Sequence, residues 1–207
     1  MLILGHTGFT LGAAILLNGA LSKMLLPKKY SLSVSPKSAP PTDSRASCPE
    51  LSSGYIDIRA LLVGSLLPDI IDKPVGQILF RDTFSNGRIF CHSLLFLLVI
   101  TSAGLYLYKR NKKTWLFAFS FGTFMHLILD QMWLTPQTLL WPLYGSAFPK
   151  ADMSHWLENI FIALRTVPSV YIPEIIGALV LSIFIGQLIR LGAWNNFIIK
   201  GAISDKS

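Results

Sequence analysis

The fold class is decided by residues 89–134, which read IFCHSLLFLLVITSAGLYLY (89–108), KRNKK (109–113) and TWLFAFSFGTFMHLILDQMWL (114–134). Each apolar run is long enough, as a helix, to cross a hydrocarbon layer of about 30 Å. The short basic link between the runs is typical of a turn on the cytoplasmic side of a membrane. Residues 89–134 therefore predict a helical hairpin within a membrane.

The composition of the whole chain supports this prediction. Of the 207 residues, 52% are hydrophobic and 14% are charged, whereas soluble domains carry about 25% charged residues. This balance excludes a soluble globular protein. The net charge of +7 does not indicate a nucleic-acid partner, because the basic residues lie at the ends of apolar runs and do not alternate with stacking aromatic residues.

Three further segments complete an all-α, integral membrane bundle of about five spans, four of them long and one short. Residues 1–22 carry no formal charge and predict an uncleaved first span, with a cleaved signal peptide as the alternative. Residues 58–71 are too short to cross a membrane comfortably as a helix. Three alternatives are open: the helix extends at both sides, it tilts into a locally thinned region of the membrane, or it is a half-helix buried against neighbouring spans. Residues 172–191 predict the last span.

We expect one membrane-embedded domain over residues 1–207, with two segments outside the spans. Residues 23–57 are rich in Ser, Pro and Lys and predict a flexible cytoplasmic loop, because they cannot bury enough apolar surface to offset the entropy of ordering. Residues 135–171, approximately, predict an outer segment with one amphipathic helix near 152–165 that lies along the membrane interface.

The positions of Lys and Arg set the expected orientation. With the N-terminus outside, twelve of these residues fall in cytoplasmic segments and five in outer segments. Positive residues are retained on the cytoplasmic side during insertion. We therefore expect a multi-pass protein in contact with membrane lipids, with its N-terminus outside and its C-terminus inside.

Six ionisable residues lie within or beside the predicted spans. An Asp at the centre of a membrane helix costs about 2.5–3.5 kcal/mol on insertion, so each such residue needs a physical reason. The topology derived from Lys and Arg alone places all six near the outer face. The six are His6, Asp69, Asp72, His92, His126 and Asp130.

Three imidazoles and three carboxylates at one depth predict a site for a divalent metal, with zinc expected first and manganese or iron(II) as alternatives. His126 and Asp130 are four residues apart, so both can face one ion from a single helix. Asp69 and Asp72 are three apart and can do the same. We expect all six residues to be ligands, enough for two metals. Taken singly, each also has a structural explanation, as a core histidine or a helix-capping carboxylate.

The roles of the charged residues near this cluster remain open. Arg88 lies one helical turn before His92 and is a candidate for binding an anionic group of a substrate, because guanidinium groups bind phosphate and carboxylate well. It could equally pair with lipid headgroups. His155 and Glu158 could supply a further ligand or a general acid, or could form a solvated helix face.

Several segments resemble those of the bacterial and archaeal membrane-bound metal-dependent hydrolases, a group also described as LexA-binding and inner membrane-associated. They are LILGHTGFTLGAA, GSLLPDIIDKP, GRIFCHSLL, and SFGTFMHLILDQMW followed by LLWPLYG. The resemblance covers about residues 1–22 and 58–145. It implies a hydrolase-like domain in the inner membrane with the six residues as its polar set. In this chain LPDIID places the two carboxylates three residues apart, whereas the commoner pattern, LPDxD, places them two apart.

The resulting prediction is a membrane-bound metal-dependent hydrolase in which metal-activated water attacks an ester. The expected substrate is a phosphoester of a lipid or of another envelope molecule. Asp69, His126 and Asp130 are expected to act in catalysis. The alternative is a non-enzymatic membrane protein that uses the same groups to carry or sense a metal ion or a proton.

Overall fold

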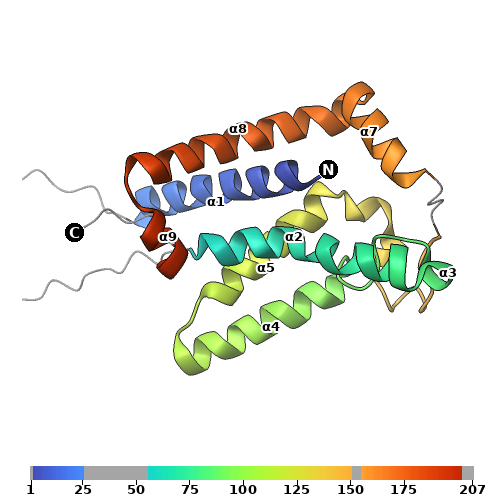
Figure 1. Cartoon of the computed structure of the whole chain (residues 1–207). Helices are drawn as coiled ribbons and strands as arrows, with labels where there is room; N and C mark the ends of the chain where they lie inside the picture. Colours follow the sequence, from blue (N-terminus) through green and yellow to red (C-terminus); the bar gives the residue numbers. More distant parts are fainter. Residues whose placement is uncertain (1, 26–55, 151–154, 202–207) are drawn as a thin grey trace, which may run out of the picture.

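The computed structural model describes residues 2–25, 56–150 and 155–201, and all regular structure in these residues is helical (Figure 1). The predicted all-α fold class is thus confirmed for this part of the chain. The predicted loop at 23–57 lies mostly outside the described residues. The nine described α-helices are α1 (Ile3–Leu25), α2 (Ile58–Pro74), α3 (Arg81–Phe84), α4 (Leu94–Asn111), α5 (Trp115–Leu129), α6 (Pro136–Leu139), α7 (Trp156–Thr166), α8 (Pro168–Arg190) and α9 (Trp194–Lys200).

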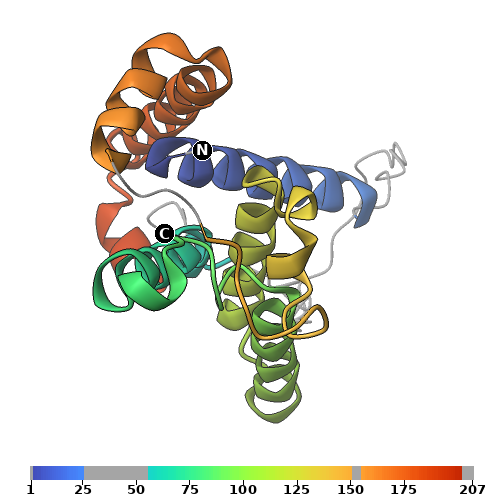
Figure 2. The same ribbon diagram turned by 90° about the vertical axis from the view of Figure 1, so that its right-hand side faces the viewer.

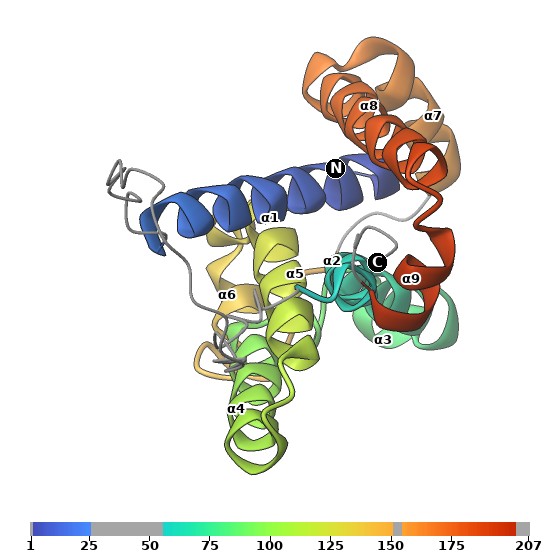
Figure 3. The ribbon, with the colours of Figure 1, turned by 90° about the vertical axis from the view of Figure 1, so that its left-hand side faces the viewer.

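The five long helices run in alternating directions. The end of α1, the start of α2, the turn between α4 and α5 and the end of α8 lie toward the left of Figure 1, and the opposite ends of these helices lie toward the right. Figures 2 and 3 show α7 and α8 at one edge of the molecule and α4 at the other, with α1, α2 and α5 between them. The arrangement is that of an up-and-down bundle.

Two helix crossings depend on glycine. A Cβ on Gly8 of α1 would collide with the backbone of Gly177 in α8, and a Cβ on Gly122 of α5 would collide with the backbone of Leu61 in α2. Small residues let helix backbones approach closely, and this is a common way of packing helices in membranes. These crossings bring α8 against α1 and α5 against α2.

Only one described helix, α8, is both long and apolar enough to cross a membrane on its own. Shorter apolar helices cover Ile3–Leu17 and Trp115–Leu129. The described helices therefore support an all-helical protein, whereas the number of about five spans remains a prediction.

The observed helix ends differ from the predicted spans for local reasons. The helix expected from residue 89 begins only at Leu94, because Ser93 is its N-cap and accepts a hydrogen bond from the backbone N of Phe96 at 3.2 Å. The helix expected to reach residue 134 ends at Leu129, because Gln131 adopts the left-handed conformation with φ of 53°. The short segment predicted at 58–71 continues as a helix to Pro74.

The outer segment predicted at 135–171 contains two helices, α6 and α7. Helix α7 begins at Trp156 and ends at Thr166, close to the amphipathic helix expected near 152–165. Residues 151–154 lie outside the described residues. Helix α8 then begins at Pro168, four residues before the predicted start of the last span.

Candidate metal centre

Three helices and the segment before α4 bring all six predicted residues together. His6 comes from the first turn of α1, and both carboxylates of the LPDIID segment come from the end of α2. His92 precedes α4, while His126 and Asp130 come from the end of α5. Each of the six is at most 9% exposed.

The crossing of α2 and α5 places the ends of these two helices beside each other. Ser65 and Asp69 are four residues apart on α2, and Gly122, His126 and Asp130 follow the same spacing along α5. Residues four apart stand on one face of a helix. The face of α5 that bears Gly122 is therefore also the face that directs His126 toward α2.

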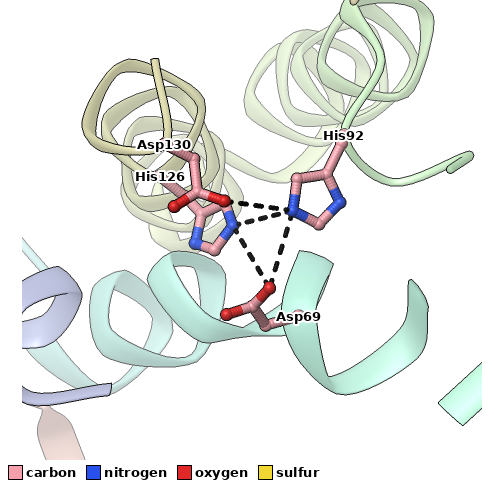
Figure 4. A group of neighbouring side chains, drawn as sticks. All are labelled: Asp69, His92, His126 and Asp130. Carbon is pink, nitrogen blue, oxygen red and sulfur yellow. Dashed lines mark hydrogen bonds and ion pairs between the residues drawn. The ribbon is translucent and has the colours of Figure 1, made fainter. Parts of the chain in front are cut away.

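Four of the six side chains surround a single point (Figure 4). Asp69, His92, His126 and Asp130 each offer one ligand atom, and these atoms all lie within 4.8 Å of one another. Nε2 of His92 is 3.1 Å from Nε2 of His126, 3.6 Å from Oδ1 of Asp69 and 3.8 Å from Oδ2 of Asp130. Nε2 of His126 is 3.9 Å from Oδ1 of Asp69.

Each of the three buried imidazoles is held through its Nδ1 atom. The partners, all at 2.7 Å, are the carbonyl oxygen of Leu2 for His6, Oδ2 of Asp72 for His92, and the carbonyl oxygen of Ser65 for His126. A carbonyl or carboxylate oxygen can only accept a hydrogen bond, so Nδ1 carries the proton in each ring. In the neutral ring, Nε2 is then left with a lone pair, which is the form that binds a metal.

When all three rings are neutral, the centre is therefore rich in lone pairs and poor in protons. Nε2 of His6 and Oδ1 of Asp69 are buried and have no hydrogen-bond partner. Nε2 of His6 lies 3.1 Å from Oδ1 of Asp130, but without the geometry of a hydrogen bond. Buried polar atoms without partners are costly, and a cation among them removes that cost. The mixed nitrogen and oxygen donors fit zinc, manganese or iron(II).

The carboxylate of Asp72 is turned away from this point. Its Oδ2 accepts hydrogen bonds from the backbone N of Ile89 at 2.8 Å and from Nδ1 of His92 at 2.7 Å. Both of its oxygens also accept from the backbone N of Cys91, at 3.0 and 3.1 Å. Asp72 was predicted as a ligand, but this geometry places it behind His92, where it orients the ring.

Two cations flank the carboxylates of the centre. Nζ of Lys73 lies 2.6 Å from Oδ2 of Asp69, and Nε of Arg88 lies 2.8 Å from Oδ2 of Asp130. The side chain of Arg88 is 43% exposed, so part of its guanidinium remains open to another partner. The predicted substrate-binding residue is thus beside the centre and paired with one of its carboxylates.

His155 and Glu158 do not join the buried cluster. Nδ1 of His155 lies 3.3 Å from Oε2 of Glu158, and both side chains are exposed on or beside α7. This position favours the solvated helix face over the role of ligand or general acid.

Glu174 is a buried acid that was not predicted as a functional residue. Glu174 lies in α8, is 8% exposed, and accepts hydrogen bonds from the backbone N atoms of Leu2, Leu4 and Gly5 at the start of α1. It is an acid within the apolar run at 172–191. The rule that identified the other six residues would have identified this one.

Fold and site together define an all-helical protein with a candidate His/Asp metal centre at one end of its long helices. A family model matches residues 1–196, and the chain accordingly belongs to the YdjM inner membrane protein family. This membership confirms the predicted location in the inner membrane. No curated protein and no solved structure matches the chain.

Proposed function

We propose that this protein is a metal-dependent hydrolase of the inner membrane that cleaves an ester bond. One observation carries the proposal. Nε2 atoms of two buried histidines, His92 and His126, and carboxylate oxygens of Asp69 and Asp130 all lie within 4.8 Å of one another. A divalent cation would stabilise this group of buried ligand atoms, whereas the packing of the helices alone does not require it. Zinc is the first choice, because it favours nitrogen and oxygen donors in four-coordinate sites.

His92, His126, Asp69 and Asp130 are the residues that would hold the metal, with His6 beside them. When bound, the metal supplies Lewis acidity that activates water and polarises the ester. Asp69 and Asp130 face the same point and are suited to accept a proton from water. His126 is fixed by Ser65, so that its ring keeps one orientation during the reaction.

The expected substrate is a phosphoester of a lipid or of another envelope molecule. Arg88 and Lys73 flank the centre, and cationic groups at this position stabilise an anionic phosphoryl group. The exposed part of the Arg88 guanidinium is suited to bind a phosphate oxygen while Nε keeps its contact with Asp130.

We further propose about five membrane spans within one domain, with the N-terminus outside. The alternating directions of the long helices support this topology, as does the excess of Lys and Arg in the segments then placed on the cytoplasmic side. In this topology the metal centre lies near the outer face, at the level of the lipid headgroups.

A membrane protein that carries or senses a metal ion or a proton is the second candidate. The observation that favours it is the burial of all six residues, since buried ionisable groups in membranes often mark a path for ions or protons. The hydrolase is expected to turn over a substrate, whereas the carrier or sensor is not.

The metal content and the turnover of the purified protein test the proposed function. The full chain, purified in mild detergent, is expected to contain about one equivalent of zinc, manganese or iron, since four ligand atoms surround one point. His126→Ala should lose most of this metal together with any hydrolysis of a panel of phosphoesters and lipids. The matched control is His155→Ala, which removes an exposed histidine.

Three outcomes are decisive. Wild-type protein without metal at neutral pH contradicts both the metal-dependent hydrolase and the metal carrier. Hydrolysis that persists in His126→Ala contradicts the catalytic assignment. If the protein moves metal across vesicle membranes and hydrolyses no substrate, the function is that of a metal carrier and not of a hydrolase.

A further inference from the structure

Glu174 is a buried carboxylate far from the metal ligands in sequence. Its Oε1 accepts a hydrogen bond from the backbone N of Leu2 at 2.6 Å. Its Oε2 accepts from Leu4 at 3.0 Å and from Gly5 at 3.1 Å. These three N–H groups lie at the start of α1, where a helix has no internal acceptors for them. Glu174 therefore caps α1 from a different helix.

The start of α1 needs such an external cap. Its first turn contains no acidic residue. The partial positive charge at a helix N-terminus favours a carboxylate at this position. Three charge-assisted hydrogen bonds offset the cost of burying Glu174 in an apolar helix.

The capped turn is also the turn that holds His6. The carbonyl oxygen of Leu2 accepts hydrogen bonds from both the backbone N of His6, at 3.2 Å, and its Nδ1, at 2.7 Å. The backbone of Leu2 therefore binds Glu174 through its N–H group and His6 through its carbonyl group. If this turn frays, the ring of His6 loses the acceptor that fixes it.

Close packing keeps α8 in the position that this cap requires. Gly177 lies three residues after Glu174, and its Cα would collide with a Cβ placed on Gly8. Residues three apart lie on neighbouring positions of one helix face. The contact between the two glycines thus brings the carboxylate within reach of the α1 N-terminus.

We propose that Glu174 is a positioning residue of the metal centre, which fixes the first turn of α1 and thereby directs Nε2 of His6 toward Asp130. The ring of His6 also stacks on that of His126, with centroids 4.3 Å apart, so a displaced His6 would disturb a second imidazole. This inference rests on the proposed metal site for its functional meaning. The fixing of α1 itself does not require a metal.

The test compares Glu174→Gln with Glu158→Gln, which removes the same charge from an exposed position. The full-length protein is stripped of metal in detergent and titrated with Co²⁺, whose visible absorption reports on the ligands. Glu174→Gln should weaken Co²⁺ binding by about tenfold, as changes behind a metal ligand typically do. Its Co²⁺ spectrum should match that of His6→Ala, and Glu158→Gln should behave like wild type.

A double variant tests whether Glu174 acts through His6. In a His6→Ala background, Glu174→Gln should weaken Co²⁺ binding by no more than about twofold, because the residue through which it acts is already gone. Effects that multiply in the double variant would overturn the proposal. An unchanged affinity and spectrum in Glu174→Gln would overturn it as well.

Hydrogen exchange of the metal-free protein separates this inference from the proposed function. Backbone amides at residues 4 and 5 should exchange about tenfold faster in Glu174→Gln and at the wild-type rate in Glu158→Gln. If wild-type protein binds no Co²⁺, the proposed function fails, and the exchange rates still decide whether Glu174 fixes α1. Unchanged exchange in Glu174→Gln would contradict that role.

Discussion

At the scale of single residues, the three imidazoles of the metal centre are fixed in different ways. His6 and His126 donate from Nδ1 to backbone carbonyl oxygens, whereas His92 donates to the carboxylate of Asp72. A carboxylate behind an imidazole makes the ring a more basic ligand than a carbonyl group does. His92 is therefore expected to be the strongest nitrogen ligand of the centre.

This difference predicts distinct effects for the two carboxylates of the LPDIID segment. Asp72→Asn should weaken zinc binding by about 10–100-fold, because it weakens the orientation and basicity of His92 without removing a ligand atom. Asp69→Asn replaces an oxygen of the centre itself and should have the larger effect. Competition with a chelator of known affinity measures both constants.

The control for these two variants is Asp82→Asn, which changes an exposed carboxylate on α3. Its zinc affinity should equal that of the wild type. If Asp72→Asn abolished binding while Asp69→Asn left it intact, the two residues would have exchanged roles and the assignment of Asp72 as an orienting group would be wrong.

Sequence reasoning found the six residues because ionisable groups in apolar runs are costly wherever they occur. The sequence did not show which of the six would be metal ligands and which would orient a ligand. The role of Asp72 depends on backbone N–H groups at 89–92, and their direction follows from how the chain enters α4. Glu174 was missed, although it lies near the outer end of the predicted last span, where the same cost of burying an ionisable group applies.

At the scale of helices, the crossing of α2 and α5 determines the shape of the centre. Gly122 lies one turn before His126, and a Cβ at Gly122 would meet the backbone of Leu61 and Ser65. The close approach of the backbones allows Nδ1 of His126 to reach the carbonyl oxygen of Ser65. A wider crossing would break this hydrogen bond.

Gly122→Ala is accordingly expected to lower the free energy of unfolding by about 1–3 kcal/mol, the usual cost of overpacking. It should also weaken zinc binding, since α5 carries two of the four ligand residues. Thermal unfolding in detergent, with and without zinc, measures both effects. The control is Gly186→Ala on α8, where an added Cβ would meet nothing within 4 Å.

In the control, the unfolding temperature should not fall, because alanine favours helices more than glycine does. Equal unfolding temperatures for Gly122→Ala and Gly186→Ala would mean that the α2–α5 crossing can widen without cost. That result would remove the packing explanation for His126.

Helix positions followed from hydropathy, but helix ends did not. The apolar run at 89–108 includes five residues before α4 begins, and three of them donate backbone hydrogen bonds to Asp72 instead of continuing the helix. Likewise, the chain leaves α5 just before Asp130, so the last carboxylate stands at a helix end. The hydropathy of a residue is the same whether it lies within a helix or just beyond its end, so only tertiary contacts determine where the helix begins and ends.

At the scale of the whole molecule, the proposed topology predicts which surfaces are accessible from each side of the membrane. The turn between α4 and α5 should face the cytoplasm, and the loop after α6 should face outward. We choose Lys112 in the turn and Leu143 in the loop, both exposed in the structure.

In a chain with Cys48 and Cys91 replaced, Leu143→Cys should react with a membrane-impermeant maleimide added to intact cells. Lys112→Cys should react only after the membrane is opened, because positive residues of short loops stay inside. Mass spectrometry of the purified protein measures the modified fraction. Reaction of Lys112→Cys in intact cells, with Leu143→Cys protected, would reverse the orientation.

The alternating helix directions could be anticipated from the order of apolar runs and basic loops. The number of complete spans could not, because a bundle can shield short helices such as α5 among longer neighbours. The resemblance to the membrane-bound hydrolases covers residues up to about 145, whereas the family match continues to residue 196 and includes α8. Glu174 lies in that added part.

The bridge between Glu174 and the first turn of α1 joins the beginning of the chain to a residue 172 positions later. A ribosome that has made α1, α2, α4 and α5 has supplied all four residues that surround the central point, yet His6 still lacks its support. That support arrives only with the synthesis and insertion of α8. The support of His6 is therefore expected only after α8 has been inserted, and chains released before this helix should acquire metal poorly.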